Sequence, residues 1–155
     1  MNQGRKRTSD EPWFKKTVAI LRKKPIWEEQ IKILQGRLDD ATPNCIAQHS
    51  LTPGGSDISD QTGNIGLRRA EWQREIRERE GGVREILSAM TLLTDEQKTI
   101  IELRYFKDLR DWHIYDLSKL PVGKTLYYQL RDDAVRIMAE CLGMLETAVK
   151  LRSTK

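Results

Sequence analysis

The segment Leu93–Leu142 constrains the fold of this chain more than any other, because its apolar residues recur at helical spacing and its interruptions are short. Thr94 opens the sequence Thr-Asp-Glu-Gln, in which a threonine and a glutamine three residues later typically cap the start of a helix. Leu-Pro-Val-Gly at 120–123 interrupts the pattern, since proline disfavours helical geometry in the preceding residue and Gly123 can act as an N-cap. We therefore predict three helices here, with the last two forming a helix-turn-helix.

The last predicted helix begins at Lys124 and has two faces. Its inner face is expected to carry Leu126 or Tyr127, together with Leu130, Ala134, Ile137, Cys141 and Leu145. Its first turns would then present outward Lys124, Thr125, Tyr128, Gln129 and Arg131. Such side chains can bond base edges or phosphates in a DNA major groove. Asp132 and Asp133 would repel phosphate, so they are expected to face away from DNA or to limit how far the helix is inserted. The alternative is a plain three-helix bundle with a solvated polar face.

Two sequences in this segment resemble a known family. LTDEQKTIIELRYF and LPVGKTLYYQLRDDAVRIMAECLG, with a tryptophan between them, resemble the C-terminal part of phage late-gene transcriptional regulators of the ArpU and RinA type. That part is similar to the fourth region of bacterial sigma factors. The resemblance covers about 50 of the 155 residues. The matching positions are Leu103-Arg104-Tyr105-Phe106, Trp112, Gly123, Thr125, Tyr127, Ala134 and Leu142. The resemblance implies a sigma-like domain that binds double-stranded DNA and activates late genes together with host RNA polymerase.

Positive charge is concentrated near the N-terminus. Residues 1–24 contain eight Lys or Arg and two acidic residues, whereas residues 94–155 contain eleven and ten. Attraction to phosphates supplies most of the non-specific affinity for DNA. We therefore expect the phosphate contacts to come from Arg5, Lys6, Arg7, Lys15, Lys16, Lys23 and Lys24.

Helical periodicity over most of the remaining chain predicts an all-α protein. The predicted parts are a basic disordered arm (1–11), an N-terminal helical region (12–40), a polar loop or linker (41–64), a long charged helix (65–92), the helix-turn-helix domain (93–147) and a tail (148–155). Pro25 should break the helical region or start a new helix, and Gly81-Gly82 should bend or break the charged helix. The buried stripe of that helix would be Ile65, Trp72, Ile76, Val83, Leu87 and Met90. A dimer seam along it is the alternative, so a homo-oligomer is also considered.

No catalytic or cofactor-binding pattern is complete in the sequence. Gly123-Lys124-Thr125 has part of a phosphate-binding loop, but Ser118 stands where that motif needs a glycine. Four residues have no partners at metal-ligand spacing: His49, His113, Cys45 and Cys141. We expect neither an enzyme nor a cofactor or metal. No apolar run reaches the roughly 20 residues of a membrane span, so we expect no membrane partner and a location in the cytoplasm of a bacterial host, with reduced cysteines.

Two other functions compete with transcriptional regulation. A DNA-recognition (small) subunit of a phage packaging terminase would use the same motif as a ring oligomer. A polymerase-binding module that does not contact DNA would suit the near-neutral C-terminal charge and the Asp132-Asp133 pair.

Overall fold

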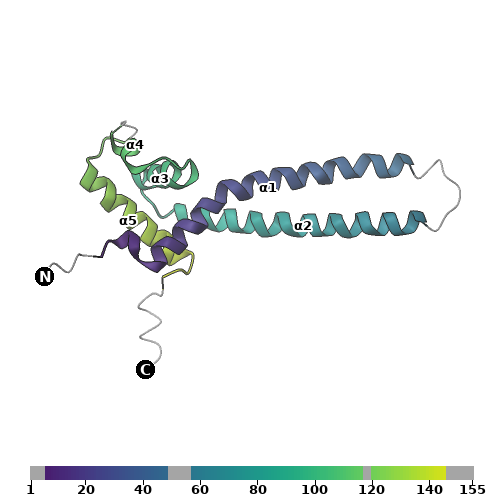
Figure 1. Ribbon diagram of the computed structural model, residues 1–155, viewed down its shortest axis with the longest axis horizontal. Coiled ribbons are helices and arrows are strands. Elements are labelled where there is room, and N and C mark those ends of the chain that lie inside the picture. Colours follow the sequence, from purple (N-terminus) through teal and green to yellow (C-terminus); the bar gives the residue numbers. More distant parts are fainter. Residues whose placement is uncertain (1–5, 49–56, 117–119, 146–155) are drawn as a thin grey trace, which may run out of the picture. The chain divides into compact units, whose positions relative to one another are not determined.

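The protein is all-α in the computed structural model, which describes residues 6–48, 57–116 and 120–145 (Figure 1). No strand occurs in these ranges, which confirms the predicted fold class. None of their helices contains an apolar stretch long enough to span a membrane. The elements are a 3-10 helix (η1, Thr8–Asp10), α1 (Pro12–Gln48), α2 (Asp57–Met90), α3 (Asp95–Ile101), a π-helical segment (η2, Glu102–Phe106), α4 (Asp111–Asp116) and α5 (Lys124–Cys141).

The chain divides into two compact units, and helices α1 and α2 contribute to both. Unit 1 comprises Met1–Pro25 and Arg84–Lys155, and unit 2 comprises Ile26–Val83. The predicted separation of the N-terminal helical region from the helix-turn-helix domain is therefore incorrect up to Pro25. The start of α1 belongs to the same compact body as α5.

Helix α1 continues through Pro25, where a break was expected. Proline in a helix costs about 3 kcal/mol, but the helix buries Leu21 before it and Leu34 after it. Full burial of such a side chain contributes about 1.5–3 kcal/mol, so packing on both sides offsets the loss.

The predicted loop at 41–64 is also shorter than expected. Residues 41–48 continue α1 and residues 57–64 begin α2, while residues 49–56 lie outside the described ones. Extending a helix adds one backbone hydrogen bond for each residue fixed, and this gain competes with the turn preference of a polar sequence.

Unit 2 contains two antiparallel helical segments, which Figure 1 shows side by side. The Nε of Arg79 donates to the Oε1 of Gln30 at 2.7 Å. Trp27 lies against Gly82, where an added Cβ would be 2.6 Å from Cζ3 of the indole. The expected bend at Gly81-Gly82 is absent, because α2 continues through both residues. Gly82 instead allows the ring of Trp27 to approach the α2 backbone closely.

Helix α2 buries different faces in the two units. Ile76 is buried in unit 2, as predicted, and Met90 is buried in unit 1. Leu87 was expected inside but is 48% exposed, whereas Ile86 is fully buried. Ile86 lies about 80° around the helix axis from Ile76, at 3.6 residues per turn. The predicted stripe was therefore wrong at Leu87, whereas Met90 is buried as predicted.

One buried cluster of unit 1 lies around Tyr127, where α3, η2, α4 and α5 meet. It consists of Ile100, Leu103, Ile114, Leu120 and Tyr127. In the π-helical segment η2, the amide of Lys107 donates to the carbonyl of Glu102, five residues earlier, at 2.9 Å. Segments of this kind are frequent at functional sites.

Local caps fix the ends of two helices in unit 1. The Thr94 hydroxyl accepts from the amide of Gln97 at 3.3 Å, and the side chain of Gln97 accepts from the amide of Thr94 at 3.0 Å, which confirms the predicted capping box. Helix α5 ends in a Schellman motif: Gly143 has a φ of +73°, and the amide of Met144 donates to the carbonyl of Ala139 at 2.8 Å.

The basic arm was expected to be disordered over 1–11. Residues 1–5 and the tail at 148–155 lie outside the described residues. Thr8–Asp10 instead form the short helix η1, and the Nζ of Lys6 lies 3.6 Å from the carboxylate of Glu11. Local hydrogen bonding and an ion pair thus order the end of the arm next to α1.

Candidate nucleic-acid interface

The start of α5 presents part of the predicted outward set. Lys124, Thr125 and Gln129 are exposed, and Tyr128 is half-buried. Gly123 is the N-cap, as predicted, with extended backbone and no side-chain hydrogen bond to the helix. The first amides of α5 therefore lack a side-chain cap, and three polar side chains stand beside them.

Tyr127, not Leu126, is the inward residue of the first turn. Tyr127 is fully buried, while Leu126 is 47% exposed. The Tyr127 hydroxyl donates to Oδ1 of Asp111 at 2.6 Å. Burial raises the pKa of Tyr127 well above its ordinary value, and this hydrogen bond raises it further. The tyrosine that carried part of the family resemblance is thus a core residue, whereas Cys141, expected inside, is exposed.

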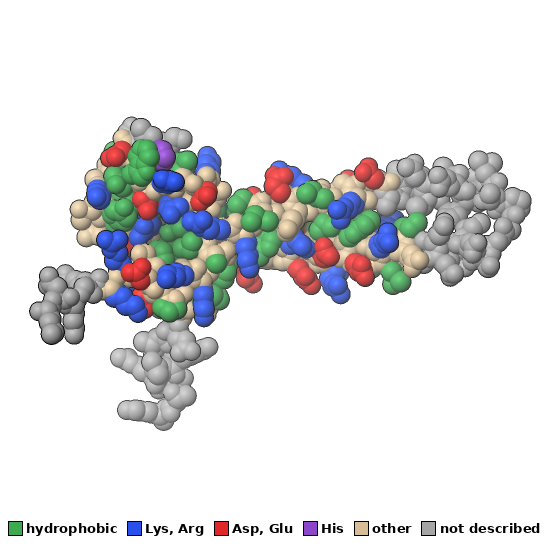
Figure 2. Space-filling view, in the orientation of Figure 1, with side chains coloured by type: hydrophobic (Ala, Val, Ile, Leu, Met, Phe, Trp, Pro, Cys, Tyr) green, Lys and Arg blue, Asp and Glu red, His purple; other side chains and the backbone are tan. Residues whose placement is uncertain are grey.

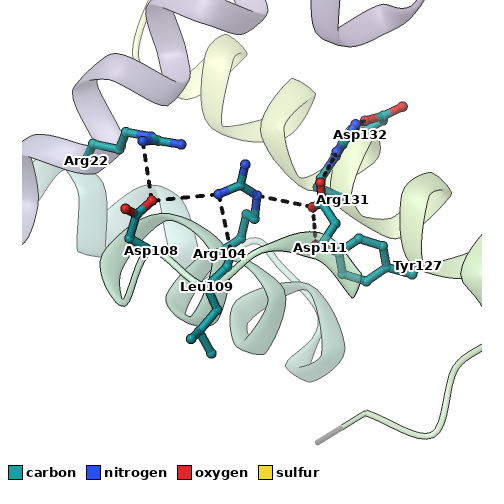
Figure 3. Close-up of polar contacts among 8 residues, drawn as sticks. All are labelled: Arg22, Arg104, Asp108, Leu109, Asp111, Tyr127, Arg131 and Asp132. Carbon is teal, nitrogen blue, oxygen red and sulfur yellow. Dashed lines mark hydrogen bonds and ion pairs between the residues drawn. The ribbon is translucent and has the colours of Figure 1, made fainter. Parts of the chain in front are cut away.

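Arg131 does not point outward, contrary to the prediction. Its side chain is 11% exposed and pairs with Asp111 at 3.3 Å and with Asp132 at 2.9 Å (Figure 3). Its guanidinium also lies over the rings of Tyr128 and Phe14, at 4.9 and 5.5 Å from their centroids. Helical spacing alone placed Arg131 outside, but two carboxylates and two rings hold it against the protein.

Asp111 connects three elements of unit 1 (Figure 3). Its carboxylate accepts from the Tyr127 hydroxyl of α5, from Arg104 Nε of η2 at 3.2 Å and from Arg131 Nη1 of α5 at 3.3 Å. Arg104 thus pairs with an acid of its own unit. The sequence carried no signal for a residue that pairs with two arginines.

A cleft of about 1010 Å³ opens on unit 1 beside these residues. Its walls come from the N-terminal segment, the first turns of α1, the η2 segment, α4 and the start of α5. Seven cationic side chains line it: Lys6, Arg7, Lys15, Arg22, Arg104, Lys124 and Arg131. Only Asp111 and Asp132 among its lining residues are acidic. Figure 2 shows many Lys and Arg side chains on the visible face of unit 1. The structure thus places cations of the arm and of α5 on one surface.

Several of these cations already have carboxylate partners. Arg104 and Arg131 pair with Asp111, Arg22 lies 3.3 Å from Asp108, and Lys6 pairs with Glu11. The other lining cations form no ion pair within residues 6–48, 57–116 and 120–145: Arg7, Lys15 and Lys124. Their positive charge remains available to an anion.

The structure separates the seven predicted phosphate contacts into groups. Lys6, Arg7 and Lys15 line the cleft, whereas Lys16 and Lys23 are exposed outside it. Lys24 is half-buried, with its Nζ 4.7 Å from the centroid of the Phe106 ring. Arg5 lies outside the described residues. Arg22, which belongs to the same basic N-terminal segment, also lines the cleft.

Comparison of the chain with protein-family models, with curated proteins and with solved structures finds no match. The geometry and charge of unit 1 therefore carry the functional argument.

Proposed function

We propose that this protein is a sequence-specific DNA-binding regulator of transcription, with α5 as its recognition helix. The observation that carries the proposal is the cleft of unit 1, where cations of the N-terminal segment lie on the same surface as the exposed start of α5. Base contacts specify a sequence and phosphate contacts position the protein on the duplex. Cations suited to phosphate contacts line the cleft, and exposed polar side chains suited to base contacts lie on the same first turns of α5.

The side chains assigned to base contacts are Thr125 and Gln129, which are exposed on α5. Glutamine can bond adenine through two hydrogen bonds, and the methyl group of threonine can contact that of thymine. Arg131 is left out of this set because Asp111 and Asp132 hold it.

The cations assigned to phosphate contacts come mainly from outside the helix-turn-helix segment. The near-neutral charge of residues 94–155 favoured a polymerase-binding module without DNA contact. Residues 6–25 belong to the same compact unit as α5 and contribute four of the seven cations of the cleft. The charge of the C-terminal segment alone therefore no longer argues against DNA binding.

Selection from random-sequence duplexes, followed by binding measurements on the enriched and random sequences, tests this function. We expect Gln129→Ala to reduce discrimination about 5- to 150-fold at one base pair, since one good bidentate contact supplies about 1–3 kcal/mol. Arg136→Ala is the control, because Arg136 is also exposed on α5 but lies seven residues beyond Gln129, away from the start of the helix. Absence of any enriched sequence, or full discrimination by Gln129→Ala, would contradict the proposal.

We further propose that the protein comes from a phage or prophage and activates late genes together with host RNA polymerase, which the sequence resemblance supports. Transcription in vitro from a promoter carrying the enriched sequence should then rise when the protein is added. An unchanged or reduced transcript level would contradict activation and leave the DNA-binding assignment to be judged by the selection experiment.

A further inference from the structure

We propose that the cleft of unit 1 is a seat for a backbone phosphate of duplex DNA, held by Arg7, Lys15 and Lys124. This inference rests on the proposed DNA-binding function and names the group that the cleft receives. Within the N-terminal segment, the proposal assigns the phosphate contact to Arg7 and Lys15 and not to all of its positive charges.

The charge balance inside the cleft supports an anion as the ligand. The two acidic lining residues, Asp111 and Asp132, are occupied by Arg104 and Arg131, at 3.2 and 2.9 Å respectively. Three further cations line the same hollow and have no ion pair in the described part of the chain. Like charges brought together in a cleft repel one another, and a phosphate that neutralises them also releases the counterions of the DNA.

The three cations come from separate parts of the chain. Arg7 precedes η1, Lys15 lies in the first turns of α1, and Lys124 opens α5. Phe14, next to Lys15, is buried and its ring lies under the guanidinium of Arg131, which links α1 to α5. The three cations therefore reach the cleft from separate parts of the chain, which suits a phosphate, since its oxygens accept hydrogen bonds from more than one direction.

The neighbouring residues of α1 provide a matched comparison. Lys15 and Lys16 are both exposed, adjacent and equally charged, but only Lys15 lines the cleft. If only the overall positive charge attracted DNA, the two lysines would contribute equally to affinity. If the cleft is a defined phosphate seat, Lys15 contributes and Lys16 does not.

The experiment measures affinity for a random-sequence duplex against salt concentration, using the full chain. Each lost phosphate contact should reduce the slope of log affinity against log salt by about 0.9. Between 50 and 200 mM salt, the affinity of Lys15→Ala should therefore fall about 3.5-fold less than that of the wild type. Lys124→Ala and Arg7→Ala should behave like Lys15→Ala, Lys16→Ala should match the wild type, and Lys15→Arg should retain the wild-type slope. Circular dichroism checks that each variant keeps its helix content.

Several other outcomes would contradict the proposed phosphate seat. Equal slope changes for Lys15→Ala and Lys16→Ala would indicate attraction by the overall positive charge, and no change for either would place the contacts elsewhere. Inorganic phosphate, added at constant ionic strength, should not displace the duplex at millimolar concentration, and displacement would point to a free-phosphate site. Equal binding of single-stranded RNA with the same dependence on Lys15 would assign the cleft to another nucleic acid.

These results remain separable from those that test the recognition helix. Phosphate contacts carry no direct sequence information, so Lys15→Ala should keep the ratio between enriched and random sequences. A wild type without any such ratio would contradict sequence-specific recognition, while the comparison of Lys15 with Lys16 on random duplex would still decide the phosphate seat.

Discussion

Asp111 accepts a hydrogen bond of 2.6 Å from the hydroxyl of Tyr127, and this contact joins α4 to the buried side of α5. The same carboxylate pairs with Arg104 and Arg131. The three partners have side chains that are mostly covered. Tyr127 donates its side-chain hydrogen bond to Asp111, and the two arginines share Asp111 in addition to their other partners, Asp132 for Arg131 and the Leu109 carbonyl for Arg104. Asp111 therefore holds the start of α5 against the remainder of unit 1.

Replacing Asp111 with alanine should destabilise the protein by about 3 kcal/mol, because it leaves two covered guanidinium groups without a shared partner. Tyr127→Phe should cost about 1.5 kcal/mol, since it removes one hydrogen bond to a charged acceptor. Urea denaturation followed by circular dichroism measures both. Asp133→Ala is the control, because Asp133 is exposed and its loss should change stability by less than about 0.5 kcal/mol. Equal losses of stability in Asp111→Ala and Asp133→Ala would contradict the structural role of Asp111.

Gly81 and Gly82 should respond in opposite ways to alanine. An added Cβ at Gly81 meets no atom within 4 Å, so the higher helix propensity of alanine should raise the free energy of unfolding by about 1 kcal/mol. At Gly82 the Cβ would meet the ring of Trp27 at 2.6 Å, and overpacking should outweigh that gain by about 1 kcal/mol. Thermal or urea denaturation compares the two variants.

A double variant shows whether Trp27 is the cause. In a Trp27→Leu background the indole is absent, so Gly82→Ala should become as favourable as Gly81→Ala. If Gly82→Ala remains unfavourable there, another contact is responsible.

Stability should decline at alkaline pH partly through Tyr105. Burial raises the pKa of Tyr105 from 10.0 to about 12 in the folded protein. A raised folded-state pKa gives stability that is fully present below about pH 10 and is lost between about pH 10 and pH 12. The slope from this group is at most about 1.4 kcal/mol per pH unit. Denaturation at several pH values should show a shallower decline in Tyr105→Phe, and an identical decline would contradict this assignment.

The capping box at the start of α3 should contribute about 1 kcal/mol. Thr94→Ala removes the acceptor of the Gln97 amide, and losing such a cap typically costs this amount. Thr99→Ala is a suitable comparison, because the Thr99 hydroxyl only bonds back to the carbonyl of Asp95 at 2.9 Å on an exposed face. Equal unfolding free energies for these two variants would show that the capping box adds no measurable stability.

Features that depend on residues close together in sequence could be predicted well. The capping box needs only Thr94 and Gln97, and the start of α5 needs only the Pro-Val-Gly sequence before Lys124. Each of these contacts spans only a few residues, so spacing along one helix or turn is sufficient.

Predictions that required a partner distant in sequence were less successful. Periodicity placed Arg131 outside, because it could not show that Asp111, twenty residues earlier, would lie beside it. The low helix propensity of glycine also favoured a bend at Gly81-Gly82, because propensity does not reveal that the ring of Trp27 packs on Gly82. Predictions from neighbouring residues assume that a polar side chain faces solvent, whereas in the folded protein its position depends on contacts with residues distant in the sequence.

The sequence by itself determined the all-α class, the caps and the start of α5, because hydrogen bonds and apolar spacing within a few residues specify them. Only the tertiary structure decided that residues 6–25 join the C-terminal helices in one unit and that Arg7, Lys15 and Lys124 line one cleft. The physical reason is that this surface forms from side chains more than a hundred residues apart, which burial of Phe14 and Leu21 and the contacts of Arg131 and Arg22 bring together.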